Sequence, residues 1–252
     1  MVSVQAFFEK NKKASEWVQS RLHLEDDAPF WVRFDEMVGE YSRRLSDGTT
    51  VVDIGGGRSC SFADQVPRDR GVRIVAVDIS PEELEANKDV DETRVADVSK
   101  HLPFEDGSVD LLVSRALLEH VNGVPNAVHE MGRVMRPGGT ILHMVPCRFS
   151  LFGLAARLLP FGPLLKLTHF VIPESAGYLG FKIYYDSCVP GTMEGLLRAA
   201  GFRDVEISIC WSQSGYFLPV FPAYLLVAAY QAIVRALGVK SLAAYMIVSA
   251  TR

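Results

Sequence analysis

The sequence lacks the features that mark several large classes of protein. Its formal net charge is −4, and it has no run of lysine and arginine interleaved with aromatic residues, which argues against nucleic acid as a partner. No acidic or histidine cluster has the spacing of a metal site, so a metal-independent protein is expected. The N-terminus has no continuous apolar stretch of the kind found in signal peptides, which predicts a cytoplasmic location.

Cysteine is scarce as well. The four cysteines, Cys60, Cys147, Cys188 and Cys210, are widely spaced and form no CxxC pair. This arrangement indicates reduced thiols in the core or in loops rather than a disulfide framework. Internal repeats, low-complexity tracts and linkers are also missing, so all 252 residues are predicted to form a single domain.

Short apolar runs alternating with amphipathic segments are what the sequence does contain. Residues 1–48 are expected to be N-terminal helices, residues 49–147 have the rhythm of βαβ units, and residues 191–252 complete the sheet. The segment at 136–139, Arg-Pro-Gly-Gly, is expected to stop a helix and lead into a strand. Seven strands are expected, in the segments TVVDI, RIVAVDI, TRVAD, VDLLVS, GTILHMVP, DVEISICW and SLAAYMIVSATR. The predicted fold class is α/β.

Two apolar segments interrupt this rhythm, at residues 148–190 and 216–239. Neither is expected to span a membrane, because prolines and Lys166 divide the first, and Pro219, Pro222, Gln231 and Arg235 divide the second. They could form a hydrophobic cap over an active site, the interface of a homodimer, or a surface in peripheral contact with a membrane. The alternative is that they add only to core and dimer packing.

The most informative segment is VVDIGGGRS at residues 51–59. Gly55 and Gly57 stand where a strand turns sharply into the next segment while a ligand approaches the backbone, and only glycine permits both. A dinucleotide fingerprint needs a third glycine at the position occupied by Cys60. Asp53, just before the loop, would repel a pyrophosphate but suits an ammonium group. The loop is therefore expected to bind a zwitterion.

Two further acids follow the next two strands. Asp78 ends the second strand, where a carboxylate can accept hydrogen bonds from both hydroxyls of a ribose. This feature is shared with NAD enzymes and does not discriminate between them and other nucleoside binders. Asp97 follows the weak third strand, where its carboxylate and the next backbone N–H can bind the edge of an adenine.

These segments, in order, carry a resemblance to a known family. VVDIGGGRS, VAVDIS, ADVSKHLPFEDGSVDLLVSRALLEHV and MGRVMRPGGTILHMVP resemble the successive motifs of class I S-adenosylmethionine-dependent methyltransferases of the type 11 kind. The resemblance is close over residues 50–147 and looser over TMEGLLRAAGFRDVEI and the last strand. It implies a doubly wound, mostly parallel sheet with strand order 3-2-1-4-5-7-6, in which strand 7 is antiparallel.

The resemblance also implies a cofactor, S-adenosyl-L-methionine, and the residues that bind it. Ser59 departs from the family, which often has a third glycine there, but a small residue should be tolerated. By position, Asp53, Gly55 and Gly57 would hold the methionine end, Asp78 the ribose with Ile79 beside it, Asp97 and Val98 the adenine, and Ser114 and Arg115 would border the sulfonium.

A catalytic base is sought beyond the fourth strand, near the cofactor sulfur. Methyl transfer is an in-line displacement, and a hydroxyl acceptor must lose its proton. His120 in SRALLEHV is the best candidate, since the pKa of free histidine lies near neutrality. The alternative is that His120 only lines the cofactor pocket. His143 is expected in the core, and His23, His101 and His169, with Tyr184, Tyr185 and Asp186, are weaker candidates.

The function predicted from these features is methylation, most simply O-methylation, of a hydrophobic small molecule or lipid-linked acceptor. Two other functions stay open. A non-catalytic protein could use the same fold to bind cofactor or a partner, and an NAD-dependent oxidoreductase shares the fold class. Asp53 and the absent third glycine argue against the oxidoreductase.

Overall fold

A computed structural model describes residues 4–22, 28–158, 162 and 181–252. Its centre is a seven-stranded sheet with the order β3-β2-β1-β4-β5-β7-β6. All neighbouring strands from β3 to β5 are parallel, whereas β7 runs antiparallel to both β5 and β6. The strands are β1 (Thr50–Ile54), β2 (Arg73–Asp78), β3 (Glu92–Val95), β4 (Val109–Arg115), β5 (Met135–Pro146), β6 (Arg203–Cys210) and β7 (Tyr245–Thr251). The predicted fold class is confirmed, together with the strand order that the resemblance implied.

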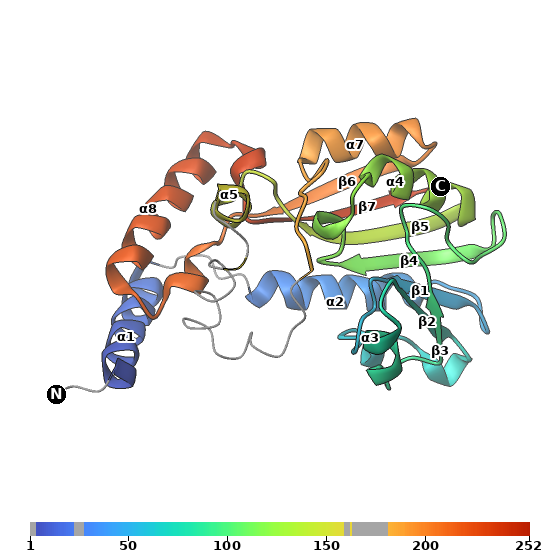
Figure 1. Cartoon of the computed structure of the whole chain (residues 1–252), viewed down its shortest axis with the longest axis horizontal. Coiled ribbons are helices and arrows are strands. Elements are labelled where there is room, and N and C mark those ends of the chain that lie inside the picture. The colour runs from blue at the N-terminus through green and yellow to red at the C-terminus, as the bar shows by residue number, and fades with distance from the viewer. Residues whose placement is uncertain (1–3, 23–27, 159–161, 163–180) are drawn as a thin grey trace.

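Helices cover both faces of the sheet (Figure 1). Helices α2 and α3 lie on one face, and α4 and α7 lie on the other. The α-helices are α1 (Val4–Leu22), α2 (Ala28–Ser42), α3 (Pro81–Ala86), α4 (Val124–Val134), α5 (Leu151–Leu158), α7 (Pro190–Ala199) and α8 (Phe221–Leu237). Short 3₁₀ helices are η1 (Ala63–Gln65), η2 (Arg68–Arg70), η3 (Leu118–His120), η5 (Ser214–Phe217) and η6 (Lys240–Leu242).

Burial on both faces explains why the central strands are continuously apolar. Leu111 and Val113 of β4 pack in one hydrophobic cluster with Phe34 of α2. Leu112, between them, belongs to the opposite cluster, which includes Met131 of α4. Successive residues of a strand point to opposite faces, so a strand covered on both sides needs apolar residues at every position.

The start of β5 differs from the prediction. The strand begins at Met135, so the segment at 136–139 lies inside it rather than before it. The pairing with β4 shifts there, because Val109 pairs with Met135 whereas Leu111 pairs with Thr140. Gly138 has a φ of +82°, a conformation that glycine adopts without strain, and this lets the extra residues form a bulge. Pro137 and Gly138 thus form a bulge within β5 and do not end a helix.

The structure describes the two apolar insertions to different extents. Of the first, the structure describes α5 and residues 181–190, whereas residues 159–161 and 163–180 lie outside the described residues. The second forms the long helix α8, which contacts α1 at one end of the molecule (Figure 1). No described helix combines the length and the apolar character that a membrane crossing requires.

Candidate functional site

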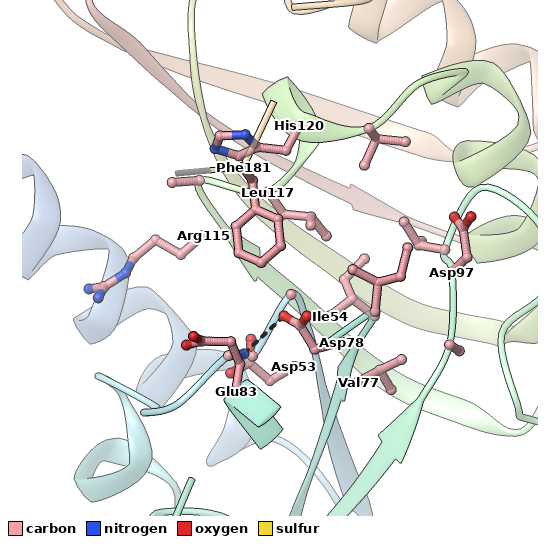
Figure 2. Close-up of a pocket in the computed structure, with 18 of the residues that line it drawn as sticks. Asp53, Ile54, Val77, Asp78, Glu83, Asp97, Arg115, Leu117, His120 and Phe181 are labelled. Carbon is pink, nitrogen blue, oxygen red and sulfur yellow. Dashed lines mark hydrogen bonds between the residues drawn. The ribbon is translucent and has the colours of Figure 1, made fainter. Parts of the chain in front are cut away.

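A cavity of about 560 Å³ lies where the carboxyl ends of β1, β2 and β4 meet. Figure 2 shows acidic residues on one side of it and His120 with Phe181 on the other. Parallel strands present their carboxyl ends at one edge of the sheet, which is where ligands bind in such folds. The predicted site residues that line the cavity are Asp53, Gly55, Gly57, Asp78, Ile79, Asp97, Val98, Arg115 and His120.

The glycine loop follows β1 and needs glycine for two separate reasons. The N–H of Gly55 donates to the carbonyl of Val77 at 2.6 Å, and a Cβ on Gly55 would stand 2.8 Å from the Cδ1 atom of Leu117. Gly57 has a φ of +45°, and no heavy atom lies within 4 Å of the place its Cβ would take. The loop therefore leaves an open cradle beside its backbone, which fits the close approach of a ligand.

Residues that sequence reasoning missed hold this loop in place. A Cβ on Gly56 would come within 2.8 Å of the Cβ of Ala76, so the loop packs directly on β2. The Asn87 side chain donates to the carbonyls of Gly56 and Gly57, at 3.1 and 3.0 Å. Gly56 is the middle residue of three consecutive glycines, which is a visible signal in the sequence. Asn87 carries no comparable signal, since its role depends on how α3 packs.

Asp53 lies buried at the base of the loop. Burial raises the pKa of its carboxyl group from 3.8 to about 7, while the charge of Arg115 and a hydrogen bond with the thiol of Cys60 act in the opposite direction. Near neutral pH the carboxyl group is therefore close to half ionised. A cation placed in the cavity would stabilise the ionised form.

Asp78 ends β2 and connects that strand with the glycine loop. One of its oxygens accepts from the N–H of Gly57 at 3.1 Å, and the other accepts from the N–H of Ser80 at 2.9 Å. These bonds hold the carboxylate at the edge of the cavity. Figure 2 labels Asp78 and marks a hydrogen bond with a dashed line. Each oxygen retains a second lone pair for a ligand hydroxyl.

Asp97 opens the turn after β3. Its Oδ1 accepts from both the N–H and the hydroxyl of Ser99, at 3.0 and 2.6 Å, and its Oδ2 lies 3.2 Å from Lys100 Nζ. Burial opposes ionisation, but these hydrogen bonds hold the pKa of Asp97 below its usual value. The carboxylate thus shapes the turn as well as lining the cavity.

Arg115 and Ser114, both predicted near the sulfonium, have different surroundings. The Arg115 guanidinium lies over the ring of Trp31, 5.3 Å from its centroid, and 3.7 Å from a carboxylate oxygen of Asp35. Ser114 does not line the cavity, because it is buried with its hydroxyl 2.7 Å from His143 Nδ1. The structure thus brings Arg115 to the cavity and places Ser114 in the core.

His143 is buried, as expected for a residue within a central strand. Burial lowers the pKa of its imidazole to about 3, so the ring is neutral. Its Nδ1 pairs with Ser114, whereas its Nε2 has no hydrogen-bond partner among the described residues.

His120 lies in η3 and lines the cavity. Its Nδ1 lies 3.1 Å from the carbonyl oxygen of Lys182, and its ring meets that of Phe181 edge to face with centroids 6.2 Å apart. A carbonyl oxygen can only accept, so Nδ1 carries the proton and Nε2 of the neutral ring is the basic atom. Burial lowers the pKa of His120 from its usual value, although its bonds to backbone carbonyls act in the opposite direction.

Glu119, which precedes His120 in the same segment, is a second titratable residue. It is buried, and burial raises the pKa of its carboxyl group to about 8. Its Oε1 lies 3.8 Å from His120 Nε2, and its Oε2 has no hydrogen-bond partner among the described residues. Its backbone carbonyl accepts from the N–H groups of Tyr184 and Tyr185, which attaches the segment after residue 180 to η3.

Much of the rest of the cavity wall is apolar or aromatic. Trp31 and Phe62 come from the side of α2, and Leu117 and Val121 flank η3. Of the weaker candidates, Tyr184 also lines the cavity, whereas His23 and His169 lie outside the described residues. Asp106 and Asp110 pair with Arg133 and Arg136, respectively, and His101 lies 3.4 Å from Glu130.

Comparison with known proteins agrees with this geometry. Residues 52–143 match the family model described as a methyltransferase domain. An uncharacterized methyltransferase of Mycobacterium sp. (strain KMS) is 42% identical over 94 residues, which cover 36% of this chain and 36% of that protein. A demethylmenaquinone methyltransferase of the same strain is 34% identical over 110 residues, which cover 42% of this chain and 44% of the relative. The matched part is thus less than half of each relative.

The fold is shared with solved structures. Phosphoethanolamine N-methyltransferase 2 of Haemonchus contortus, in complex with S-adenosyl-L-methionine, superimposes with a TM-score of 0.54 and 17% sequence identity, covering 88% of this chain and 52% of that chain. The match in sequence falls on the strands and loops that build the cavity, and the match in fold extends beyond them. Residues 52–143 thus match the methyltransferase domain that the motifs predicted, and the chain shares its fold with a solved methyltransferase that binds S-adenosyl-L-methionine.

Proposed function

We propose that the chain methylates an apolar small-molecule or lipid-linked acceptor with S-adenosyl-L-methionine as the methyl donor. The observation that carries this proposal is the gathering of Asp53, Asp78 and Asp97, from three successive strand ends, around one cavity with an open glycine cradle. Three carboxyl groups suit a ligand with an ammonium group, ribose hydroxyls and an adenine amine. They would disfavour the pyrophosphate of a dinucleotide.

Each part of the cofactor then has residues that could hold it. Asp53 and the backbone of Gly55 and Gly57 would bind the methionine end, and Asp78 would accept from the ribose hydroxyls. The exposed side chain of Ile79 offers an apolar surface for the adenine, next to Asp97 and Val98. Arg115 lies at the cavity wall toward α2 and would border the region of the sulfonium.

The acceptor would occupy the part of the cavity between η3 and α2. Trp31, Leu117, Phe181 and Tyr184 line this part and supply apolar surface, which suits a hydrophobic molecule. The partial similarity to a demethylmenaquinone methyltransferase points to the same class of acceptor. The reacting group of that acceptor would face His120.

When bound, the cofactor supplies an electrophilic methyl group on a sulfonium. His120 would take the proton from an acceptor hydroxyl at its Nε2, because the Lys182 carbonyl keeps the proton on Nδ1. The lowered pKa keeps this imidazole neutral at physiological pH. The aromatic ring of Phe181 would limit the access of water to that proton transfer.

Two other functions make different demands on the cavity. A non-catalytic scaffold would bind S-adenosylmethionine without turnover, and an NAD-dependent oxidoreductase would bind the dinucleotide. The missing third glycine and the carboxyl group of Asp53 speak against the dinucleotide.

Titration calorimetry separates the alternatives at the level of binding. S-adenosylmethionine and S-adenosylhomocysteine should bind the wild type, and NAD should not. Asp78→Ala should weaken both ligands by about 10-fold or more, because it removes a hydrogen-bonded anion from the ribose site. Asp69→Ala, which alters an exposed residue of η2, is the matched control. Tight NAD binding, or unchanged affinity in Asp78→Ala, would contradict the proposal.

Turnover is tested separately. A lipid or metabolite extract incubated with the chain and S-adenosylmethionine should contain molecules heavier by one methyl group. S-adenosylhomocysteine should accumulate in step with them. Cofactor binding without any methylated product would favour the scaffold.

A further inference from the structure

Helix α8 exposes an apolar face. Leu226, Ile233 and Leu237 have 74%, 60% and 70% of their surface exposed. Leu225, just before them, and three alanines between them, at 229, 232 and 236, are exposed as well. This spacing of three and four residues places all of them on one side of the helix. The opposite side is buried through Tyr224, Val227 and Val234, so α8 is apolar on its outer face as well as its inner one.

Helix α1 adds an aromatic and basic face to the same end of the molecule. It is joined to the turn just before α8 by Ser15, whose hydroxyl donates to the Leu218 carbonyl at 2.9 Å. Phe7 and Trp17 are 54% and 62% exposed. Their spacing with residues 10 and 21 places them on one side together with Lys10 and Arg21, and the Arg21 guanidinium lies 5.7 Å from the Trp17 ring centroid.

The charge of this end is opposite to that of the whole chain. The α1 sequence contains Lys10, Lys12, Lys13 and Arg21 against two glutamates, and residues 214–240 contain Arg235 and Lys240 without any acidic residue. The net charge of the chain is −4. An apolar surface bordered by basic and aromatic residues is the combination that binds the headgroup region of an anionic bilayer.

We propose that the outer faces of α1 and α8 form a docking surface for a bilayer that contains anionic lipids. The leucines and isoleucine of α8 would enter the boundary between headgroups and acyl chains. Trp17 would lie at headgroup level, and the lysines of α1 would pair with lipid phosphates or other anionic headgroups. A second copy of the chain fits this surface less well, because a symmetric contact would bring two sets of basic side chains together.

The position of this surface relates it to the cavity. In Figure 1, β4 points toward the end of the molecule at which α1 and α8 lie. The cavity lies at the carboxyl end of β4, so it is on the same side as the proposed surface. For a lipid-linked acceptor this arrangement would shorten the path from the bilayer, a consequence that rests on the proposed function. Lipid binding itself does not depend on methyl transfer.

Vesicle flotation tests the proposal. The wild type should float with phosphatidylcholine vesicles that contain phosphatidylglycerol and should bind far more weakly to phosphatidylcholine alone. Changing Leu226, Ile233 and Leu237 together to Gln should abolish flotation. Changing Lys10 and Lys13 together to Gln should lower the affinity for anionic vesicles by roughly 10-fold or more and reduce its salt dependence.

Val32→Gln is the matched control, since Val32 is an exposed apolar residue of α2 outside this surface. Its vesicle binding should equal that of the wild type. Circular dichroism and S-adenosylhomocysteine binding, measured without vesicles, establish that the variants fold and keep the cofactor site. A wild type that ignores anionic vesicles, or an α8 variant that still binds them, would overturn the proposal. A dimer that the α8 variant disrupts, with no vesicle binding, would assign the surface to a second copy.

Discussion

At the scale of single residues, Asp53 should couple cofactor binding to pH. The pKa of its carboxyl group is raised to about 7 by burial, and only the ionised form attracts the ammonium group of S-adenosylmethionine. Between about pH 6 and pH 7.5 the ionised fraction rises severalfold, so the affinity should rise severalfold over the same range. Calorimetric titration with S-adenosylhomocysteine, which carries the same ammonium group, measures this change.

Asp53→Asn is the variant that isolates this effect. The amide has nearly the same shape but cannot ionise, so the affinity should be low and should no longer change over this pH range. Asp64→Asn, at an exposed aspartate in η1, should leave the pH dependence as it is in the wild type. An unchanged pH dependence in Asp53→Asn would show that another group is responsible.

His120 governs a second, separate pH dependence. His120→Ala should lower the turnover of a hydroxyl acceptor by about 10²–10⁴, the usual contribution of a positioned base, and should change cofactor affinity little. Because burial lowers the pKa of His120, the wild-type rate at saturating cofactor, where the pH-dependent affinity that Asp53 causes has no effect, should stay level through neutral pH. The rate should fall only as the pH drops below the usual histidine range, where the imidazole becomes protonated.

Steady-state rates as a function of pH measure this. His101→Ala serves as the control, because His101 is exposed and does not line the cavity. If His120→Ala retained full activity on a hydroxyl acceptor, the base would have to be another residue, and Tyr184 in the cavity wall would be tested next.

Glu119 should make stability depend on pH. Burial raises the pKa of its carboxyl group from 4.5 to about 8, so the folded chain retains a proton that the unfolded chain releases. Its contribution to the free energy of unfolding is present in full below the unfolded pKa and is lost as the pH rises through the folded one. The contribution of Glu119 should therefore fall from about pH 5 to pH 8 by on the order of a few kcal/mol.

Glu119→Gln should remove much of that loss, since glutamine stays neutral throughout. Urea unfolding at several pH values, read by circular dichroism, compares the two proteins. The raised pKa of Asp53 contributes to the slope in both, so the informative quantity is the difference between them. Equal slopes would mean that Glu119 ionises as freely in the folded chain as in the unfolded one.

Sequence reasoning located residues whose role is local and missed those whose role depends on contacts between distant segments. Asp53 and Asp78 could be predicted, because a strand end and a glycine loop place them. The burial of the Ser114 side chain could not be predicted, since its partner is His143, 29 positions along the chain. The positions of Trp31 and Asn87 depend in the same way on how α2 and α3 pack on the sheet.

At the scale of elements, Arg252 joins the end of β7 to two helices. Its Nε donates to the carbonyl of Gly132 at 2.9 Å, and its Nη1 donates to the carbonyl of Gly201 at 3.1 Å. These carbonyls belong to α4 and to the turn after α7. Arg252→Ala removes both bonds and should lower the free energy of unfolding by about 1–3 kcal/mol.

Urea unfolding at constant pH measures this loss. Arg203→Ala is the matched control, because Arg203 is an exposed arginine at the start of the neighbouring strand β6. Cofactor affinity should be unchanged in both variants, since neither residue lines the cavity. A variant Arg252→Ala as stable as the wild type would show that water satisfies the two carbonyls equally well.

Elements buried on both faces could be predicted from the sequence, and irregular ones could not. The apolar runs of β1, β2 and β4 identify them without knowledge of their neighbours. The bulge at the start of β5 is different, because it exists only in register with β4, and its residues resemble a helix stop. Likewise, the sequence does not predict that the helical segment after β4 is divided, with His120 at the end of the short helix η3 and α4 beginning at Val124.

At the scale of the whole molecule, composition identified two apolar insertions but not their arrangement. Hydropathy alone does not distinguish a face that packs on the core from one that faces outward, and α8 has both kinds. The packing of α8 on α1 and on the rest of the fold determines which residues, such as Leu226 and Ile233, stay exposed.

The four cysteine thiols are buried, so their reaction with an added reagent would report local unfolding of the chain. Cys60 lies in the core cluster beneath the glycine loop, and Cys188 lies in the cluster on the other face of the sheet. Burial raises the pKa of both thiols, so neither should react with an alkylating reagent until its surroundings open. Mass spectrometry of timed alkylation should therefore record a separate rate of modification for each thiol. S-adenosylhomocysteine should slow the alkylation of Cys60 more than the alkylation of Cys188. Equal slowing of both would mean that the chain opens only as a whole.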